Sequence, residues 1–164
     1  MLLCDVRIFI CYEVNIMETL VKAFIQNEAG SKIKNRHNEK TLEHLGYFEL
    51  EEPYPCPYGF ILETTTEDGD NVDCCVLTHE KLRSGTIVEC HPIGLLEVFE
   101  DGELDHKVIA VLPGEPYKGV YEALDSVRRF YQGVSKQFPT KEFIIGDFLP
   151  QESAMEFIRK FKDS

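Results

Sequence analysis

Apolar residues along the chain recur with two different periods, and the change between them divides the sequence into two parts. Up to residue 112 they come in short runs that alternate with turn-forming Gly, Pro, Asn and Asp, a pattern typical of strands. Strands are expected at 21–25, 45–50, 74–78, 86–90, 93–99 and 107–112. Strands this short, with turns at close intervals, favour a small antiparallel barrel or sandwich.

Beyond Pro116 the apolar period becomes that of a helix. One residue in every three or four is apolar, which predicts an amphipathic helix carrying Tyr121, Leu124, Val127, Phe130 and Val134 on one face. A last strand over 143–145 and a closing helix after Pro150 complete the expected elements. No repeat, low-complexity segment or linker interrupts this order, so we expect a single domain over residues 17–164. Residues 1–16 form an N-terminal extension, either an added strand or sequence upstream of a start at Met17.

Length and charge narrow the function classes. The 164 residues suit one domain with a real core. The net charge of −12 argues against nucleic acid as a partner, because nucleic acid is bound chiefly by Lys and Arg. The N-terminal segment is too short and too charged for a membrane span and has the wrong flanks for a signal peptide. None of the six cysteines forms a C-x-x-C pair, and reduced thiols in a cytoplasmic protein are expected.

Carboxylates are concentrated just before a buried strand. Asp68, Asp70 and Asp73 precede the apolar run 74–77. Carboxylates this close raise one another's pKa, and a divalent metal bound through oxygen ligands would relieve the repulsion. A calcium EF-hand is excluded because Val72 and Asp73 stand at the fifth and sixth loop positions and no helices flank the loop. A solvated turn is the alternative interpretation.

A second acidic group lies at another strand end and favours a metal site over a solvated turn. It comprises Glu100, Asp101, Glu103 and Asp105. Lys107 follows Asp105 by two residues, so both side chains share one face of a strand. Two carboxylate clusters with an aligned lysine fit a multi-metal site bridged by phosphate.

The basic stretch 32–40 allows two interpretations. Lys32, Lys34 and Arg36 share one face of an expected strand. They either solubilise an edge strand and discourage aggregation or aim cations at a phosphate.

Several motifs together resemble those of the family I (soluble) inorganic pyrophosphatases. The matching segments are Y-P-C-P-Y-G-F-I at 54–61, D-G-D-N-V-D at 68–73, P-I-G at 92–94 and G-E-L-D-H-K-V-I-A-V at 102–111, in family order and spacing. The resemblance implies a five-stranded OB-like antiparallel barrel with two helices in the C-terminal half, which agrees with the pattern of strands and helices above. It also implies hydrolysis of pyrophosphate to two phosphates with several Mg²⁺ ions, for which Mn²⁺ is a substitute, and it is compatible with a homo-oligomer.

The resemblance also implies a role for each matching residue. Asp70 matches the carboxylate that handles the attacking water. The matched metal ligands are Asp68, Asp73, Asp105 and Glu100, the last in place of an aspartate. The matched or neighbouring phosphate contacts are Lys34, Tyr58, Lys107, Arg36 and Lys136, with Lys32 as the competing alignment for Lys34.

Departures from the family pattern fall mostly on the phosphate side. The segment 42–53 lacks the family's arginine, Val134 replaces a tyrosine, and Lys136 is displaced from the position of the family's lysine. Gln26 and Arg36 stand where the family has carboxylates. We therefore weigh a Mg²⁺-dependent pyrophosphatase against two alternatives: a metal- and phosphate-binding protein of the same fold with little turnover, and a hydrolase of another phosphoanhydride.

Overall fold

A computed structural model describes residues 19–114 and 116–164. The expected N-terminal extension, residues 1–16, lies outside the described residues. The strands are β1 (Val21–Asn27), β2 (Ile33–His37), β3 (His44–Glu49), β4 (Tyr58–Ile61), β5 (Asp73–Leu77), β6 (Ile87–Glu100), β7 (Glu103–Leu104), β8 (Lys107–Val111) and β9 (Phe143–Pro150). The helices are α2 (Val120–Gln137) and α3 (Gln151–Phe161).

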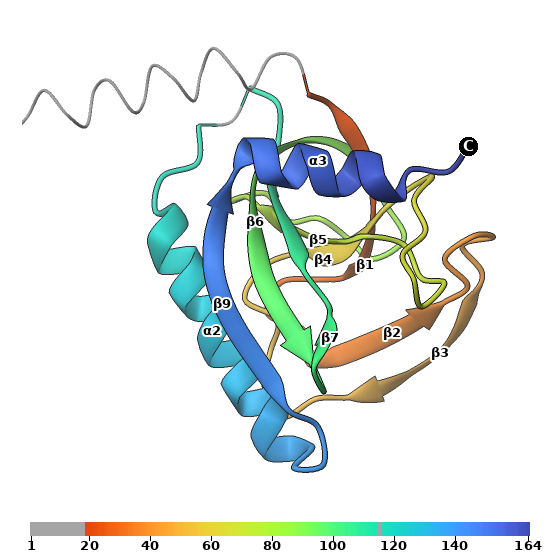
Figure 1. The fold of residues 1–164 in the computed structure, drawn as a ribbon. Coiled ribbons are helices and arrows are strands. Elements are labelled where there is room, and N and C mark those ends of the chain that lie inside the picture. The colour runs from red at the N-terminus through yellow and green to blue at the C-terminus, as the bar shows by residue number, and fades with distance from the viewer. Residues whose placement is uncertain (1–18, 115) are drawn as a thin grey trace, which may run out of the picture.

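Most of the strands form one strongly curled sheet (Figure 1). Its order is β1-β4-β5-β8-β6-β7, with β9 on β6, and β1 also pairs with β6. Hydrogen-bonded neighbours therefore lead from β1 through β4, β5, β8 and β6 back to β1. The expected mainly-β, OB-like fold with two helices is confirmed.

One pair of neighbouring strands departs from the antiparallel arrangement that the turn spacing predicted. β5 and β8 run parallel, with Asp73 opposite Lys107. They are not joined by a hairpin, since β6 and β7 lie between them in the chain, and a connection of that length permits a parallel pair.

β6 merges two strands that the sequence pattern separated at Pro92. The strand runs without interruption over 14 residues, and its pairing with β8 shifts register between Pro92 and Gly94. Proline lacks an N–H for the ladder, so a bulge accommodates it inside a strand.

The strands nearest the site are buried on both faces, which explains their continuous apolar runs. Alternate residues of β5 and β8 contribute to two clusters. Cys75 and Ile109 join the cluster that contains Leu124 and Val127 of α2. Cys74 and Val108 join the cluster that contains Ile158 of α3. Each helix therefore covers its own side of the sheet. The apolar face expected for α2 is confirmed at Leu124, Val127, Phe130 and Val134, whereas Tyr121 is exposed.

Gly59 marks a close approach of two backbones beside the site. A Cβ at this position would lie 1.8 Å from the carbonyl oxygen of Phe24 on the neighbouring β1. Only glycine fits there. The residue thus fixes β4, and with it Tyr58, against β1.

β2 and β3 form a separate two-stranded sheet that extends beside the curled sheet (Figure 1). No helix among the described residues is long and apolar enough to cross a membrane.

Candidate active site

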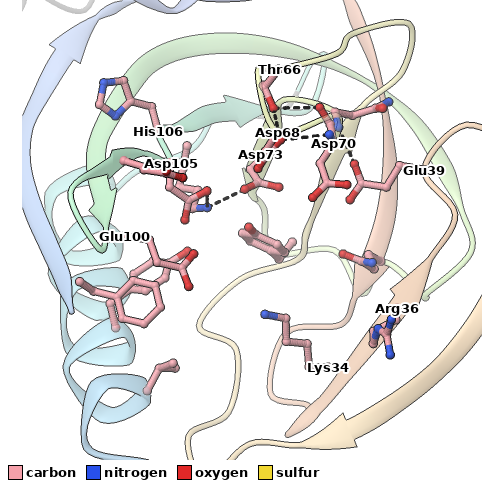
Figure 2. A pocket seen from close by; sticks show the side chains of 18 of the residues that line it. Lys34, Arg36, Glu39, Thr66, Asp68, Asp70, Asp73, Glu100, Asp105 and His106 are labelled. Atoms are coloured by element: carbon pink, nitrogen blue, oxygen red, sulfur yellow. Dashed lines mark hydrogen bonds and ion pairs between the residues drawn. The ribbon is translucent and has the colours of Figure 1, made fainter. Parts of the chain in front are cut away.

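A cleft of about 920 Å³ opens between the curled sheet and the β2–β3 hairpin. It collects all but one of the site residues that the sequence pointed to. Of the expected metal and water-handling carboxylates, Asp68, Asp70, Asp73, Glu100 and Asp105 line it. Of the expected phosphate contacts, Lys34, Arg36, Tyr58 and Lys107 line it. Figure 2 shows the carboxylates on one side, with Lys34 and Arg36 across the cleft from them.

Strand register brings the two acidic groups together. Asp73 begins β5 and is the partner of Lys107 at the start of the parallel strand β8. Asp105 lies two residues before Lys107, and Glu100 ends β6. The acidic segments 68–73 and 100–105, which are far apart in the sequence, therefore open into the same cleft.

Lys107 is the electrostatic centre of the site. Its side chain is buried, and its Nζ lies 2.6 Å from Asp73 Oδ2 and 2.8 Å from Asp105 Oδ1. Burial by itself lowers the pKa of Lys107, but the two carboxylates outweigh it and hold this pKa well above its usual range. Burial raises the pKa of Asp105 to about 6, even though Lys107 favours its charged form.

The two aspartates of the D-G-D motif have opposite environments. Asp68 accepts hydrogen bonds from the Thr66 hydroxyl (2.5 Å) and from the Asp70 backbone N–H (3.0 Å). The Thr66 bond is the main reason that its pKa is lowered. Asp70 is exposed at the mouth of the cleft, and partial desolvation, followed by the charges of Asp68 and Asp73, raises its pKa. The pKa values of these two neighbouring carboxyl groups are therefore shifted in opposite directions.

The phosphate side is lined by cations and tyrosines. The Lys34 Nζ lies 5.5 Å from the centre of the Phe48 ring. Lys34 is exposed along its length, but desolvation of its ammonium group in the cleft, followed by the charge of Lys107, lowers its pKa. The Lys107 Nζ lies 5.7 Å from the centre of the Tyr58 ring. Burial raises the pKa of Tyr58, so its hydroxyl stays protonated. Lys32, the alternative to Lys34 in the sequence comparison, does not line the cleft.

Lys136 lies outside the cleft, and a different lysine from the same part of the chain lines it. Lys141, just before β9, places its Nζ 2.6 Å from Glu100 Oε1. The sequence analysis missed Lys141 because only the pairing of Glu100 with Phe143 brings the two residues together. Glu39 was also missed, since it stands in a stretch that was interpreted through its basic residues. It lines the cleft near Asp70 (Figure 2).

The donor set fits a hard divalent cation. Every candidate ligand is a carboxylate oxygen, the ligand type that such ions prefer. Within residues 19–114 and 116–164, no three acidic, histidine or cysteine side chains converge closely enough to hold an ion by themselves. An ion in this cleft would complete its shell with water and substrate oxygens, as is usual for Mg²⁺.

Comparison with known proteins agrees with the geometry. The family model described as inorganic pyrophosphatase matches residues 23–164. Soluble inorganic pyrophosphatase 1 of Arabidopsis thaliana is 34% identical over 146 residues, which is 82% of this chain and 68% of the relative. Soluble inorganic pyrophosphatase 2 of Chlamydomonas reinhardtii is 31% identical, over 88% of this chain and 80% of the relative.

A solved structure shares the fold over nearly the whole chain. The inorganic phosphatase from Anaplasma phagocytophilum superposes with a TM-score of 0.77 at 27% identity, over 88% of this chain and 92% of that one. The family match, over residues 23–164, spans all the residues that line the cleft. The chain belongs to the inorganic pyrophosphatase family, a family of hydrolytic enzymes.

Proposed function

We propose that the protein hydrolyses inorganic pyrophosphate to two phosphates in a Mg²⁺-dependent reaction. The observation that carries the proposal is the convergence of Asp68, Asp70, Asp73, Asp105 and Lys107 on one cleft, faced by Lys34 from the hairpin, in a chain of this family. Mn²⁺ is the expected substitute metal, and the cytoplasm is the expected location.

Asp68, Asp73, Asp105 and Glu100 are the proposed metal ligands. Bound Mg²⁺ would lower the pKa of a water and neutralise charge on the phosphoryl group. Each acidic segment supplies two of the four proposed ligands, so ions held by them would lie within the same cleft. Lys107 pairs with both Asp73 and Asp105 and balances one of their two negative charges, and it would share their carboxylate groups with the metal.

Asp70 is the proposed proton acceptor. The water oxygen attacks one phosphorus, the bridging P–O bond breaks, and the water proton passes to the Asp70 carboxylate. A raised pKa makes Asp70 a better base than Asp68 beside it. Lys34, Lys107 and the Tyr58 hydroxyl are placed to stabilise negative charge on the leaving phosphate. Arg36 is a further proposed phosphate contact, whereas Lys136, which lies outside the cleft, is dropped from the set.

Release of phosphate from pyrophosphate tests the proposal. Wild-type protein with Mg²⁺ should release phosphate, and a chelator should abolish the release. The same measurement with a nucleoside diphosphate tests the alternative of another phosphoanhydride. Calorimetry with Mg²⁺ and pyrophosphate separates a binding protein from an enzyme. Tight binding without phosphate release would overturn the proposed activity.

A further inference from the structure

The hairpin that carries Lys34 and Arg36 shares no strand ladder with the curled sheet in the described part of the chain. Main-chain hydrogen bonds between Tyr54 and residues 30–31 hold the connection that leads into β2, and side-chain contacts contribute to the position of the hairpin over the cleft. One anchor joins the middle of β2 to the end of β1. The Asn35 backbone N–H donates to Asn27 Oδ1 at 2.8 Å, and Asn35 Nδ2 donates to the Gln26 carbonyl at 3.0 Å.

A second anchor lies at the hairpin's turn, where Lys40 reaches the loop between β4 and β5. Its Nζ donates to the Thr64 carbonyl (2.7 Å), to Thr65 Oγ1 (2.7 Å) and to Asn71 Oδ1 (2.5 Å). An ammonium group has three N–H donors, and these three acceptors use all of them. All three N–H groups of Lys40 are therefore hydrogen-bonded to the loop, whereas most surface lysines are hydrogen-bonded to water.

Glu39, the residue before Lys40, also contacts the loop between β4 and β5. Its Oε2 accepts a hydrogen bond from the Asn71 backbone N–H at 2.6 Å (Figure 2). Asn71 is buried, and its Nδ2 donates to the Ile61 carbonyl at 3.0 Å. Hydrogen bonds thus hold both the main chain and the side chain of Asn71 in place. Since Asn71 directly follows Asp70, this contact also sets the backbone that presents the Asp70 carboxylate.

We infer that Glu39 and Lys40 form a clasp that positions the carboxylate loop 64–73 against the cation-bearing hairpin. The clasp joins the two halves of the cleft, because β2 holds Lys34 and Arg36 while the gripped loop holds Asp68 and Asp70. The effect that we expect of the clasp on pyrophosphate hydrolysis rests on the proposed function. Neither residue of the clasp needs to touch substrate. Each acts through the placement of other groups, and loss of such supporting contacts typically costs about 10- to 100-fold in metal affinity or activity.

Replacement of Lys40 by Met tests the clasp, with Lys22→Met on β1 as the matched control. Lys22 is exposed and lies outside the cleft. In Lys40→Met we expect Mg²⁺ affinity, measured by calorimetry, and kcat/KM for pyrophosphate each to fall by about 10- to 100-fold. Hydrogen exchange in residues 64–71 should speed up, while exchange in β5 and β8 stays slow. The control should match wild type in all three measurements.

Two substitutions at Glu39 separate the hydrogen bond from the charge. Glu39→Gln keeps an oxygen that can accept from the Asn71 N–H, so Mg²⁺ affinity should stay within about threefold of wild type. Glu39→Leu removes the acceptor and should behave like Lys40→Met. Equal losses in both Glu39 variants, or wild-type Mg²⁺ affinity and loop exchange in Lys40→Met, would overturn the clasp. A wild type without pyrophosphate hydrolysis would refute the proposed activity alone, because loop exchange tests the clasp without turnover.

Discussion

Replacement of Lys107 by Met removes the buried cation that holds the two acidic segments together. Its Nζ lies 2.6 Å from Asp73 and 2.8 Å from Asp105. Loss of one partner from a buried ion pair costs about 3–5 kcal/mol. The side chains of Asp73 and Asp105 are 23% and 25% exposed. Water therefore compensates part of the loss, and we expect a cost of about 2–4 kcal/mol.

Thermal unfolding without metal measures this cost. In a chain of 164 residues, a loss of this size should lower Tm by roughly 4–16 °C. Mg²⁺ should recover more stability in Lys107→Met than in wild type, because the metal then meets two carboxylates without a competing ammonium group.

In the same variant, the affinity for Mg²⁺ and the affinity for pyrophosphate should change differently. Affinity for Mg²⁺, measured by calorimetry, should equal or exceed that of wild type. KM for pyrophosphate should rise by about 10-fold or more, since a hydrogen bond to a charged group contributes about 1.5–3 kcal/mol. An unchanged metal-free Tm, or a fall in Mg²⁺ affinity together with an unchanged KM, would refute the role given to Lys107.

Other residues and conditions give three further predictions. Lys34→Met should raise KM for pyrophosphate by about 10-fold, whereas Lys32→Met, outside the cleft, should leave it unchanged in the same assay. Lys141→Met should change unfolding stability by less than about 1 kcal/mol in denaturant titrations, because its ion pair with Glu100 is partly exposed. A folded-state pKa of about 6 means that ionised Asp105 destabilises the metal-free fold above that pH. Metal-free Tm should therefore fall, and the Tm increase caused by Mg²⁺ should grow, from about pH 4 to about pH 6, and both should level off above about pH 7.

The period of the apolar residues predicted an element well where burial of a single apolar face determines its structure. The 18-residue α2 has a single apolar face and extends the expected helix by only a few residues. Pairing across distance was harder to predict. The division of β6 at Pro92 and the antiparallel orientation of β5 and β8 were inferred from local turn signals, whereas tertiary pairing decides both.

The candidate site divides in the same way. Asp68, Asp70 and Asp73 were found because three carboxylates before a buried strand form a local pattern. Lys141 reaches the cleft only through the register of β6 with β9. Glu39 reaches it only through the fold of the hairpin turn onto Asn71. Both contacts join residues that are far apart in the sequence, so neither could have been predicted from the spacing of residues alone.

The most direct test of the central claim is the rate of phosphate release from pyrophosphate by wild type and by Asp70→Asn at saturating Mg²⁺. Asparagine keeps the shape of the side chain but cannot take the water proton. The account predicts Mg²⁺-dependent release by wild type and a loss of about 10²- to 10⁴-fold in kcat for Asp70→Asn, with Mg²⁺ binding retained. Equal rates in the two proteins would contradict it.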